Sequence, residues 1–231
     1  MYVYGKNVVN EILKDNTPIK KVFLSDNFSD KDILNKLRSL NTNTKYCKPY
    51  ELDKIVEGNH QGIILEVSDY QYFDIDDLLV NENPLIVILD HLEDPHNFGA
   101  IIRTCEAAGI DGIIIPKNRS VDVNSTVMKT STGALNHVKI CQVTNLKNTI
   151  DYLKKKGFWI VGTDMDGTDY TQVDYKGKMA IITGSEGFGM SRLVKDNCDF
   201  IASIPMYGEV NSLNASVATA IIIYEAIKQR R

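Results

Sequence analysis

From residue 85 to residue 204 the chain repeats one pattern: a short run of mostly apolar, often branched residues, a polar turn, and a stretch of helical character. Such runs are typical of strands that are buried on both faces of a parallel sheet and joined by helices. The pattern therefore predicts an α/β fold with a mainly parallel sheet. The runs are LIVILD, GIIIP, HVKIC, FWIVGTD, MAIITG and DFIASIP.

The stretches between these runs are the expected helices. They extend from about Asn97 to Ala108, from Val123 to Leu135, from Asn145 to Lys156, from Gly189 onward, and from Leu213 to Gln229.

The first 72 residues predict a separate, smaller α/β unit. Helix-like stretches at residues 6–14 and 30–40 alternate there with the strand-like runs KKVFLS, TKYC and GIILEVS. The acidic stretch FDIDDLLVNEN then leads to Pro84, and such a composition marks a boundary. We therefore expect one domain at 1–72, a linker with a short helical turn at 73–83, and a second domain at 84–231.

The linker carries the whole charge imbalance of the chain. The formal net charge is −4, yet residues 1–72 hold ten basic and ten acidic side chains and residues 84–231 hold sixteen of each. The linker adds four acidic side chains and no basic one. Indiscriminate coating of nucleic acid is thus disfavoured, whereas a local RNA-binding face on either domain stays open.

Composition also argues against membrane and metal-centred classes. No apolar run approaches the roughly 18 residues of a membrane span, and the amino terminus has no signal-peptide core. The cysteines form no C-x-x-C pair and the histidines no i,i+4 pair. We expect a cytoplasmic protein without a metal site.

Three polar, glycine-marked loops each follow a predicted strand. They are DHLEDPHNFGAIIRTCEAAG, GSEGFGM and PMYGEVNSLNAS. Because ligands on parallel sheets gather beyond the carboxyl ends of the strands, the loops are expected to form one pocket. GSEGFGM matches neither phosphate-binding glycine motif, and Glu186 within it would repel a phosphate. A neutral, zwitterionic or cationic ligand is favoured, although an ordinary turn is the alternative.

Single residues in these loops have simpler explanations as well. Arg103 would be a solvated helix charge that pairs with Glu106. Asn97 would be a helix cap, and Asn211, Ser212 and Asn214 offer caps for the last helix.

Taken together, DPHNFGAIIRTCEAAG, TGSEGFGM and IPMYGEVNSLNASVATAI resemble the three motifs of the SpoU/TrmH branch of the SPOUT RNA 2′-O-methyltransferases, in order and spacing. The resemblance covers residues 85–231. The first 72 residues resemble the ribosomal-protein-like substrate-binding domain of the RlmB group, the 23S rRNA guanosine-2′-O-methyltransferases. Cys105 and Ala215 are small departures from the motifs.

The resemblance implies a knotted (trefoil) methyltransferase domain that works as a homodimer, with the last helix and the first motif helix at the interface. It also implies that the loops bind S-adenosyl-L-methionine. The residues implied for cofactor binding are Thr183, Gly184, Gly187, Ile204, Met206 and Leu213. Those implied for catalysis are Arg103, Asn97, Glu186, Ser212 and Asn214.

The implied reaction is methyl transfer to a ribose 2′-hydroxyl, with no metal. A guanidinium remains protonated, so we expect Arg103 to bind the adjacent phosphate and stabilise the developing alkoxide rather than accept the proton. Local charge suggests that the first domain selects the RNA through Lys6, Lys20, Lys21 and Arg38. The alternatives are a tRNA ribose methyltransferase, an antibiotic-resistance rRNA methyltransferase, and an RNA-binding ribosome-assembly protein without turnover.

Overall fold

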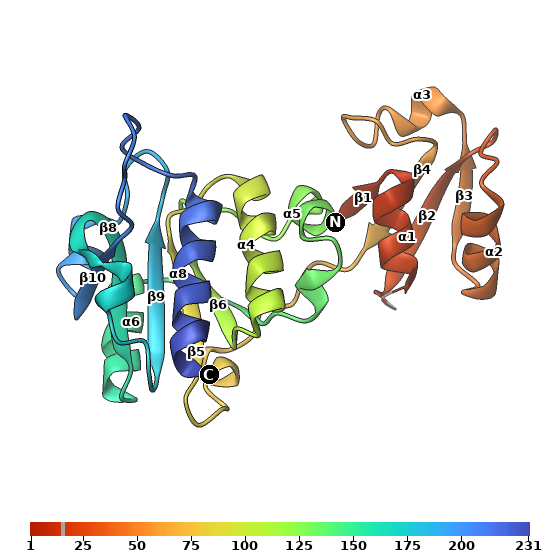
Figure 1. Ribbon diagram of the computed structural model, residues 1–231. Coiled ribbons are helices and arrows are strands. Elements are labelled where there is room, and N and C mark those ends of the chain that lie inside the picture. Colours follow the sequence, from red (N-terminus) through yellow and green to blue (C-terminus); the bar gives the residue numbers. More distant parts are fainter. Residues whose placement is uncertain (15–16) are drawn as a thin grey trace.

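The computed structural model describes residues 1–14 and 17–231 and contains two α/β units on separate sheets (Figure 1). In the first unit the strands run in the order β1-β4-β2-β3. Strand β4 is antiparallel to β1 and β2, whereas β2 and β3 are parallel. The elements are β1 (Tyr2–Tyr4), α1 (Lys6–Lys14), β2 (Ile19–Ser25), α2 (Lys31–Ser39), β3 (Thr44–Cys47), α3 (Pro49–Leu52) and β4 (Ile63–Val67).

Helix α1 shows how the first unit forms its core. Its apolar residues Val8, Val9 and Ile12 recur at helical spacing and are buried. They pack with the inward side chains of β2 and β4 in one cluster. The small unit therefore has its own hydrophobic core, as a separate domain requires.

The second unit has the expected parallel sheet. Its strand order is β10-β8-β9-β5-β6-β7, and each neighbouring pair is parallel. The strands are β5 (Leu85–Asp90), β6 (Gly112–Pro116), β7 (Ile140–Val143), β8 (Trp159–Asp169), β9 (Met179–Gly184) and β10 (Phe200–Ser203). Every residue of β5, β6 and β9 is buried, as in a sheet covered on both faces.

Helices cover both faces of this sheet. Helices α4 and α8 pack with one apolar cluster, and α6 and α7 with the cluster on the other face (Figure 1). The bounds are α4 (Pro95–Ala108), α5 (Ser125–Ser131), η2 (Ala134–Asn136), α6 (Leu146–Lys155), η3 (Tyr170–Gln172), α7 (Arg192–Lys195) and α8 (Ala215–Arg230). In the part of the chain that the structure describes, no helix is long and apolar enough to span a membrane.

The acidic segment at 73–83 lies against the second sheet. The Phe73 amide donates to the Ile140 carbonyl at 2.9 Å. Leu78, at the end of the short helix η1 (Ile75–Leu78), is buried over Gly112, where a Cβ would lie 2.3 Å from the Leu78 Cγ. The segment therefore packs against the second unit.

Two expected helices differ from the structure. The stretch from Val123 to Leu135 is broken because Thr132 and Gly133 have positive φ angles of 47° and 85°. The helix expected from Gly189 begins only at Arg192. Residues 185 and 189 instead exchange backbone hydrogen bonds of 3.0 and 2.9 Å, which close a tight turn.

Candidate active site

Three loops that are far apart in the sequence meet through one hydrogen-bonded network. Asn214 Nδ2 donates to Asn97 Oδ1 and to Glu186 Oε1, both at 2.9 Å. Asn97 Nδ2 also donates to Glu186 Oε1. A single carboxylate oxygen thus accepts from two amides, so the three loops are held in one arrangement.

Asn97 is free for this network because another residue caps its helix. Asp94 is the N-cap of α4 and accepts from the His96 amide at 2.9 Å, with Pro95 in the first turn. Asn97 lies in the first turns of α4 and is only 6% exposed. The cap interpretation of Asn97 is therefore wrong, and its buried amide is satisfied by the other two loops.

Asn214 combines two tasks. It is the N-cap of α8, where its Oδ1 accepts from the Ser216 amide at 3.0 Å and the Val217 amide at 3.4 Å. Its Nδ2 group remains for the network with the other loops. The residue therefore ties the start of α8 to the other two loops, because its side chain carries a separate acceptor oxygen and NH2 donor group.

A hollow of about 490 Å³ lies beside the network, beyond the carboxyl ends of β9 and β10. Glu186 and Ser212 lie on its wall, and the Ser212 side chain makes no hydrogen bond to any described residue. All six residues expected to bind a cofactor line it: Thr183, Gly184, Gly187, Ile204, Met206 and Leu213.

The shape of the glycine loop depends on Gly184. A Cβ on this residue would lie 2.0 Å from the Gly189 carbonyl carbon and 2.2 Å from the Met190 nitrogen. No side chain other than hydrogen fits there, so the loop can fold back closely on itself. At the end of the same strand, the Thr183 and Thr219 hydroxyls lie 3.0 Å apart in a buried hydrogen bond that connects β9 to α8.

Apolar residues and glycines line the hollow, together with Glu186 and Asp164. Burial works to raise the pKa of Asp164. The hydrogen bond from Lys195, at 2.8 Å, the Asp166 amide and the positive charge of Lys195 outweigh it and lower the pKa overall. The wall therefore keeps a paired carboxylate at neutral pH, which suits a neutral, zwitterionic or cationic ligand.

Arg103 lies away from this hollow. It is exposed on α4 and lines another hollow, of about 700 Å³, together with residues such as Thr104, Thr132 and Tyr224. Among the described residues no ion pair joins it to Glu106. Within one chain the structure therefore separates Arg103 from Asn97, Glu186, Ser212 and Asn214.

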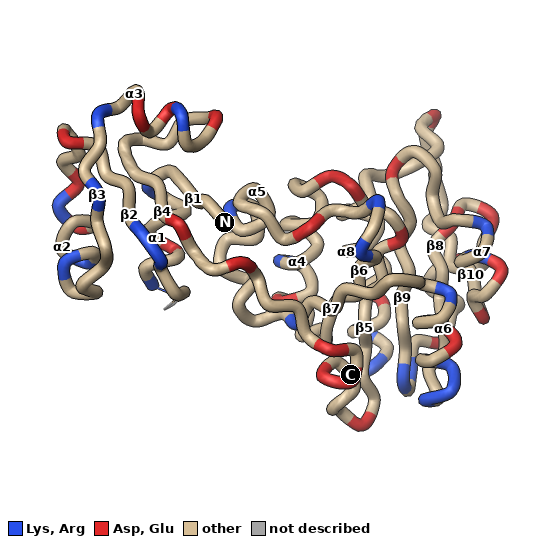
Figure 2. The backbone as a smooth tube through the Cα atoms, turned by 180° about the vertical axis from the view of Figure 1, so that it is seen from behind, with Lys and Arg blue, Asp and Glu red and all other residues tan. Residues whose placement is uncertain are grey.

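The basic residues expected to bind RNA are spread over several elements of the first unit. Lys6 on α1 pairs with Asp30 at 3.3 Å. Lys21 on β2 lies over the Phe23 ring at 5.0 Å. Lys20 and Arg38 are exposed on β2 and α2. Figure 2 shows basic and acidic residues interspersed on this unit.

Asp90 is a residue of this region that the sequence patterns did not single out. It is 1% exposed at the carboxyl end of β5, where its Oδ2 accepts from the Ser191 amide at 2.7 Å and its Oδ1 contacts His91 Nδ1. It thereby fixes the chain that leaves the glycine loop. A charged residue at the end of an otherwise apolar run could have indicated this role.

The described part of the chain contains no cluster of three or more His, Cys, Asp or Glu side chains that could hold a metal ion. The four cysteines are free thiols.

Comparison with known proteins gives two family matches. The model of the SpoU rRNA methylase family matches residues 84–224. A model described as RNA 2′-O ribose methyltransferase substrate binding matches residues 2–73. Together they span nearly the whole chain.

Known proteins and solved structures are similar to this chain over most of its length. YacO of Bacillus subtilis, described as a candidate TrmH family tRNA/rRNA methyltransferase, is 42% identical over 99% of this chain and 96% of its own. The SpoU methyltransferase AviRb of Streptomyces viridochromogenes, solved with AdoMet, has a TM-score of 0.87 and 26% identity and covers 99% of this chain and 89% of its own.

A TrmH/SpoU tRNA-modifying enzyme of A. aeolicus aligns over a smaller part. It has a TM-score of 0.58 and 34% identity, and it covers 66% of this chain and 79% of its own.

Proposed function

This chain belongs to the SpoU rRNA methylase family, and we propose that it methylates a ribose 2′-hydroxyl of RNA, with a guanosine of 23S rRNA as the substrate. It has the SPOUT methyltransferase fold with an amino-terminal substrate-binding domain, and it is an RNA methyltransferase that uses S-adenosylmethionine. The observation that carries the proposal is the network in which Asn97 and Asn214 donate to Glu186, a residue on the wall of the hollow.

The hollow fits the cofactor by its chemistry. The apolar side chains of Ile204, Met206 and Leu213 suit an adenine ring, and the backbone from Thr183 to Gly187 offers groups for polar contacts. Glu186 suits the positive charge of a sulfonium. When bound, S-adenosylmethionine supplies the methyl group for transfer.

We assign positioning of the ribose to the loop network. Glu186 is held by two amide donors, so its second oxygen stays available to accept from a substrate hydroxyl. Ser212 lies on the same wall, and Asn97 fixes Glu186 through its hydrogen bond. A fixed geometry of this kind lowers the barrier of a displacement because it removes the entropic cost of orientation.

We assign to Arg103 the role of binding the phosphate beside the target ribose and stabilising the developing alkoxide. Its position outside the hollow favours contact with RNA over contact with cofactor. Its guanidinium stays protonated, so the proton leaves through phosphate or water.

The proposed assembly is a homodimer through α4 and α8. In support, Val217 and Tyr224 on α8 are 47% and 51% exposed, although both are large apolar residues. An apolar surface of this kind is typical of a subunit interface. Arg103 lies in the same region, since Tyr224 lines the hollow that it shares.

The choice of rRNA rests on the first domain. The A. aeolicus tRNA-modifying enzyme aligns over 66% of this chain, whereas an rRNA methyltransferase of Sinorhizobium meliloti aligns over 98%. We propose residues 1–72 as the domain that selects the RNA, through Lys6, Lys20, Lys21 and Arg38, 73–83 as the linker and 84–231 as the catalytic domain. The four free thiols agree with a cytoplasmic setting.

Methyl transfer from labelled S-adenosylmethionine to separate rRNA and tRNA pools, followed by nucleoside mass spectrometry, tests the proposal. We expect label in 2′-O-methylguanosine from 23S rRNA. Label in tRNA or in another nucleoside would keep the chemistry and overturn the substrate, and absence of label from both pools and from ribosome-assembly intermediates would favour a binding protein without turnover.

A further inference from the structure

A separate hollow of about 350 Å³ lies beyond the carboxyl ends of β5, β6 and β7, which are neighbouring parallel strands. Leu146 and Val194 on its wall belong to the apolar cluster under α6 and α7, so the hollow lies toward that face of the sheet. We call it the basic hollow and define it by polar residues that line it: His91, Asn118, Arg119, Thr144, Lys147 and Ser191.

The wall of the basic hollow has cationic side chains and lacks acidic ones. Arg119 and Lys147 come from different segments, and no Asp or Glu of the described residues lines the hollow. Arg119 takes part in no ion pair within the described part of the chain. Lys147 pairs with Asp151 on its own helix, and both side chains are 38% exposed, so the pair is weak. Such a wall suits an anion.

Two residues of this wall have an unusual backbone. His91 and Arg119 have positive φ angles of 56° and 54°, which are uncommon for residues other than glycine. The Val121 amide and the Ser120 hydroxyl donate to the Leu92 carbonyl at 2.8 and 3.1 Å, so the two loops hold each other. Backbone strain of this kind gathers at binding and catalytic sites. A ligand shared by both residues would account for it.

The basic hollow shares its wall with a neighbour of the candidate active site. A middle hollow of about 520 Å³ is lined by His91 and Arg119 and also by Glu186 and Gly187. Glu186 and Gly187 in turn line the hollow assigned to the cofactor. The three hollows therefore form a row, with Glu186 on the wall of the first two and Arg119 on the wall of the last two.

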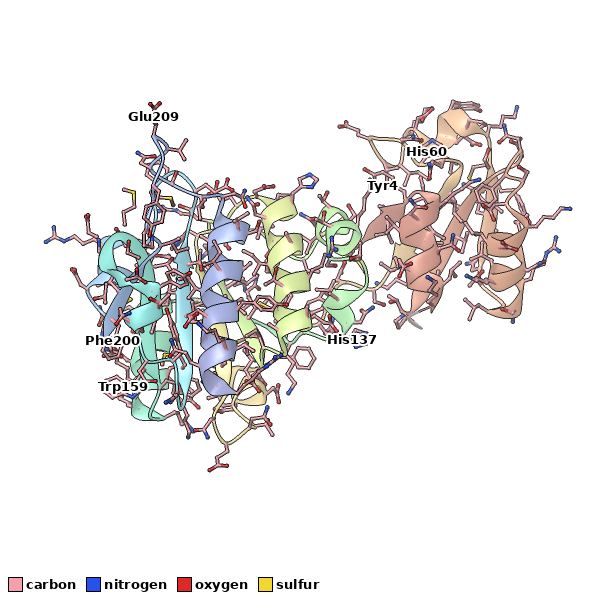
Figure 3. The ribbon with its side chains drawn as sticks, viewed as in Figure 1. Tyr4, His60, His137, Trp159, Phe200 and Glu209 are labelled. Atoms are coloured by element: carbon pink, nitrogen blue, oxygen red, sulfur yellow. The ribbon has the colours of Figure 1, made fainter. Side chains whose placement is uncertain are left out.

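Figure 3 shows which edge of the second sheet holds this row. Trp159 and Phe200, the first residues of β8 and β10, lie at the lower edge, and Glu209, in the loop after β10, lies at the top. Because the strands are parallel, all their carboxyl ends lie at the upper edge. The basic hollow and the candidate active site thus open at the same edge.

The middle hollow differs from the basic hollow in charge. Four acidic residues line it: Asp90, Glu93, Asp94 and Glu186. They disfavour a phosphate there, whereas an uncharged ribose or base is not repelled. A phosphate attached to that sugar is attracted to the basic hollow. The order of charges along the row therefore matches the alternation of sugar and phosphate in an RNA chain.

We propose that the basic hollow binds a phosphate of the substrate RNA beside the nucleotide that is methylated, with Arg119 as its main ligand. The inference rests on the proposed function. A guanidinium presents a planar fork of donors that matches phosphate oxygens, and Lys147 adds a point charge. Contacts of this kind position a nucleic acid without reading its bases.

Arg119 adds to the role assigned to Arg103. Arg103 lies on α4 and lines none of the three hollows of the row. A target ribose within RNA has a phosphate on each side, so the two arginines are assigned to different phosphates.

The salt dependence of RNA binding tests the proposal with the full-length protein and 23S rRNA. Arg119→Gln should raise Kd about tenfold and lower the slope of log Kd against log salt by about one, because one phosphate contact is lost. Arg192→Gln is the control, since this 95% exposed arginine of α7 lines none of these hollows. Equal slopes for Arg119→Gln and the unchanged protein would overturn the inference.

Arg119→Gly separates RNA binding from folding. Glycine adopts a positive φ without strain, so this variant should unfold at the same urea concentration as the unchanged protein or at a higher one. Its affinity for RNA should fall as in Arg119→Gln. A lower urea midpoint together with normal RNA binding would mean that Arg119 only supports the fold.

A free nucleotide carries the same phosphate chemistry as RNA. Titration with guanosine monophosphate distinguishes the two sources, and we expect it to compete with rRNA only weakly. If guanosine monophosphate bound tightly and Arg119→Gln lost that binding but kept its affinity for rRNA, the basic hollow would be a nucleotide site and the inference would be wrong.

Kinetics separate failure of this inference from failure of the proposed function. With 23S rRNA, Arg119→Gln should raise KM about tenfold with little change in kcat. If the unchanged protein methylates rRNA and Arg119→Gln equals it in KM and in salt slope, only the inference fails. If the unchanged protein transfers no methyl group to any RNA, the proposed function fails, and the salt slopes still decide whether Arg119 binds phosphate.

Discussion

Asn214 Nδ2 donates to Asn97 Oδ1 at 2.9 Å across 117 positions of sequence. This contact joins the start of α8 to the first turns of α4, and Glu186 completes it from the glycine loop. The candidate site is thus a property of the tertiary fold, since its three members come from three separate segments of the chain.

Replacement of Asn214 separates its two tasks. Asn214→Ala should lower stability by about 1 kcal/mol because the helix loses its cap. It should lower kcat about 10- to 100-fold because Glu186 loses a charged hydrogen bond. Asn214→Ser keeps a capping oxygen but has no amide, so we expect near-normal urea unfolding together with the same loss of activity. Normal activity in Asn214→Ser would show that the amide network has no catalytic part.

Gly184→Ala tests the dependence of the hollow on a closely folded loop. The added methyl would lie 2.0 Å from backbone of the same loop, so the loop must open and binding of S-adenosylmethionine should be lost in calorimetry. Gly208→Ala is the matched control, because its Cβ would meet no atom within 4 Å. Equal affinities in the two variants would mean that the glycine loop does not form the binding wall.

The sequence predicts more of the scaffold than of the site. Branched apolar runs correctly predicted the parallel sheet, because burial on both faces leaves a continuous apolar pattern. The prediction of a helix from Gly189 was wrong. Residues 185 and 189 form two backbone hydrogen bonds with each other, and these close a turn instead. The glycine-rich sequence left both outcomes open, and the contacts of the folded loop decide between them.

Long-range contacts account for the other differences. Asparagine is a common N-cap residue, so the sequence suggested that Asn97 caps its helix. Only the fold reveals that Asp94 caps the helix and that Asn97 donates to Glu186. Likewise, the bond from the Ser191 amide to Asp90 joins positions that are 101 residues apart. Periodicity describes neighbours along the chain, whereas these contacts depend on how the strands are ordered.

Arg103→Lys tests the role assigned to the guanidinium. A lysine keeps the charge but not the planar fork, so we expect a 10- to 100-fold loss in kcat/KM. The affinity for S-adenosylmethionine should be unchanged, because Arg103 lies outside the hollow. Arg192→Lys, at a 95% exposed side chain on α7, is the control and should have no effect. Near-normal turnover in Arg103→Lys would contradict a fork-dependent role.

Low pH should reduce the stability of the folded protein through protonation of Asp164. Its pKa is lowered in the folded protein, so its contribution to stability is complete above the ordinary value of 3.8 and is lost as the pH falls further below it. Urea midpoints of the unchanged protein should therefore fall more steeply below about pH 4 than those of Asp164→Asn. Parallel pH profiles would show that the pair with Lys195 contributes nothing.

The stability of the isolated catalytic domain should depend on the residue at which the fragment begins. A chain that starts at Tyr70 keeps Leu78 over Gly112 and should fold and bind S-adenosylmethionine. A chain that starts at Asn83 loses that buried leucine and should be less stable by at least about 2–5 kcal/mol. Calorimetry and urea unfolding distinguish them. Efficient methylation of the same rRNA nucleotide by the longer fragment would show that the first domain does not select the substrate.

Alkaline hydrolysis of 23S rRNA after incubation with the enzyme and S-adenosylmethionine tests the central claim most directly. A methylated 2′-oxygen cannot attack the neighbouring phosphate, so modification leaves one alkali-resistant linkage at a defined position. We predict this linkage with the unchanged protein and its near absence with Asn214→Ser. Methyl incorporation that leaves every linkage sensitive to alkali would place the methyl group on a base and contradict 2′-O-methylation at this site.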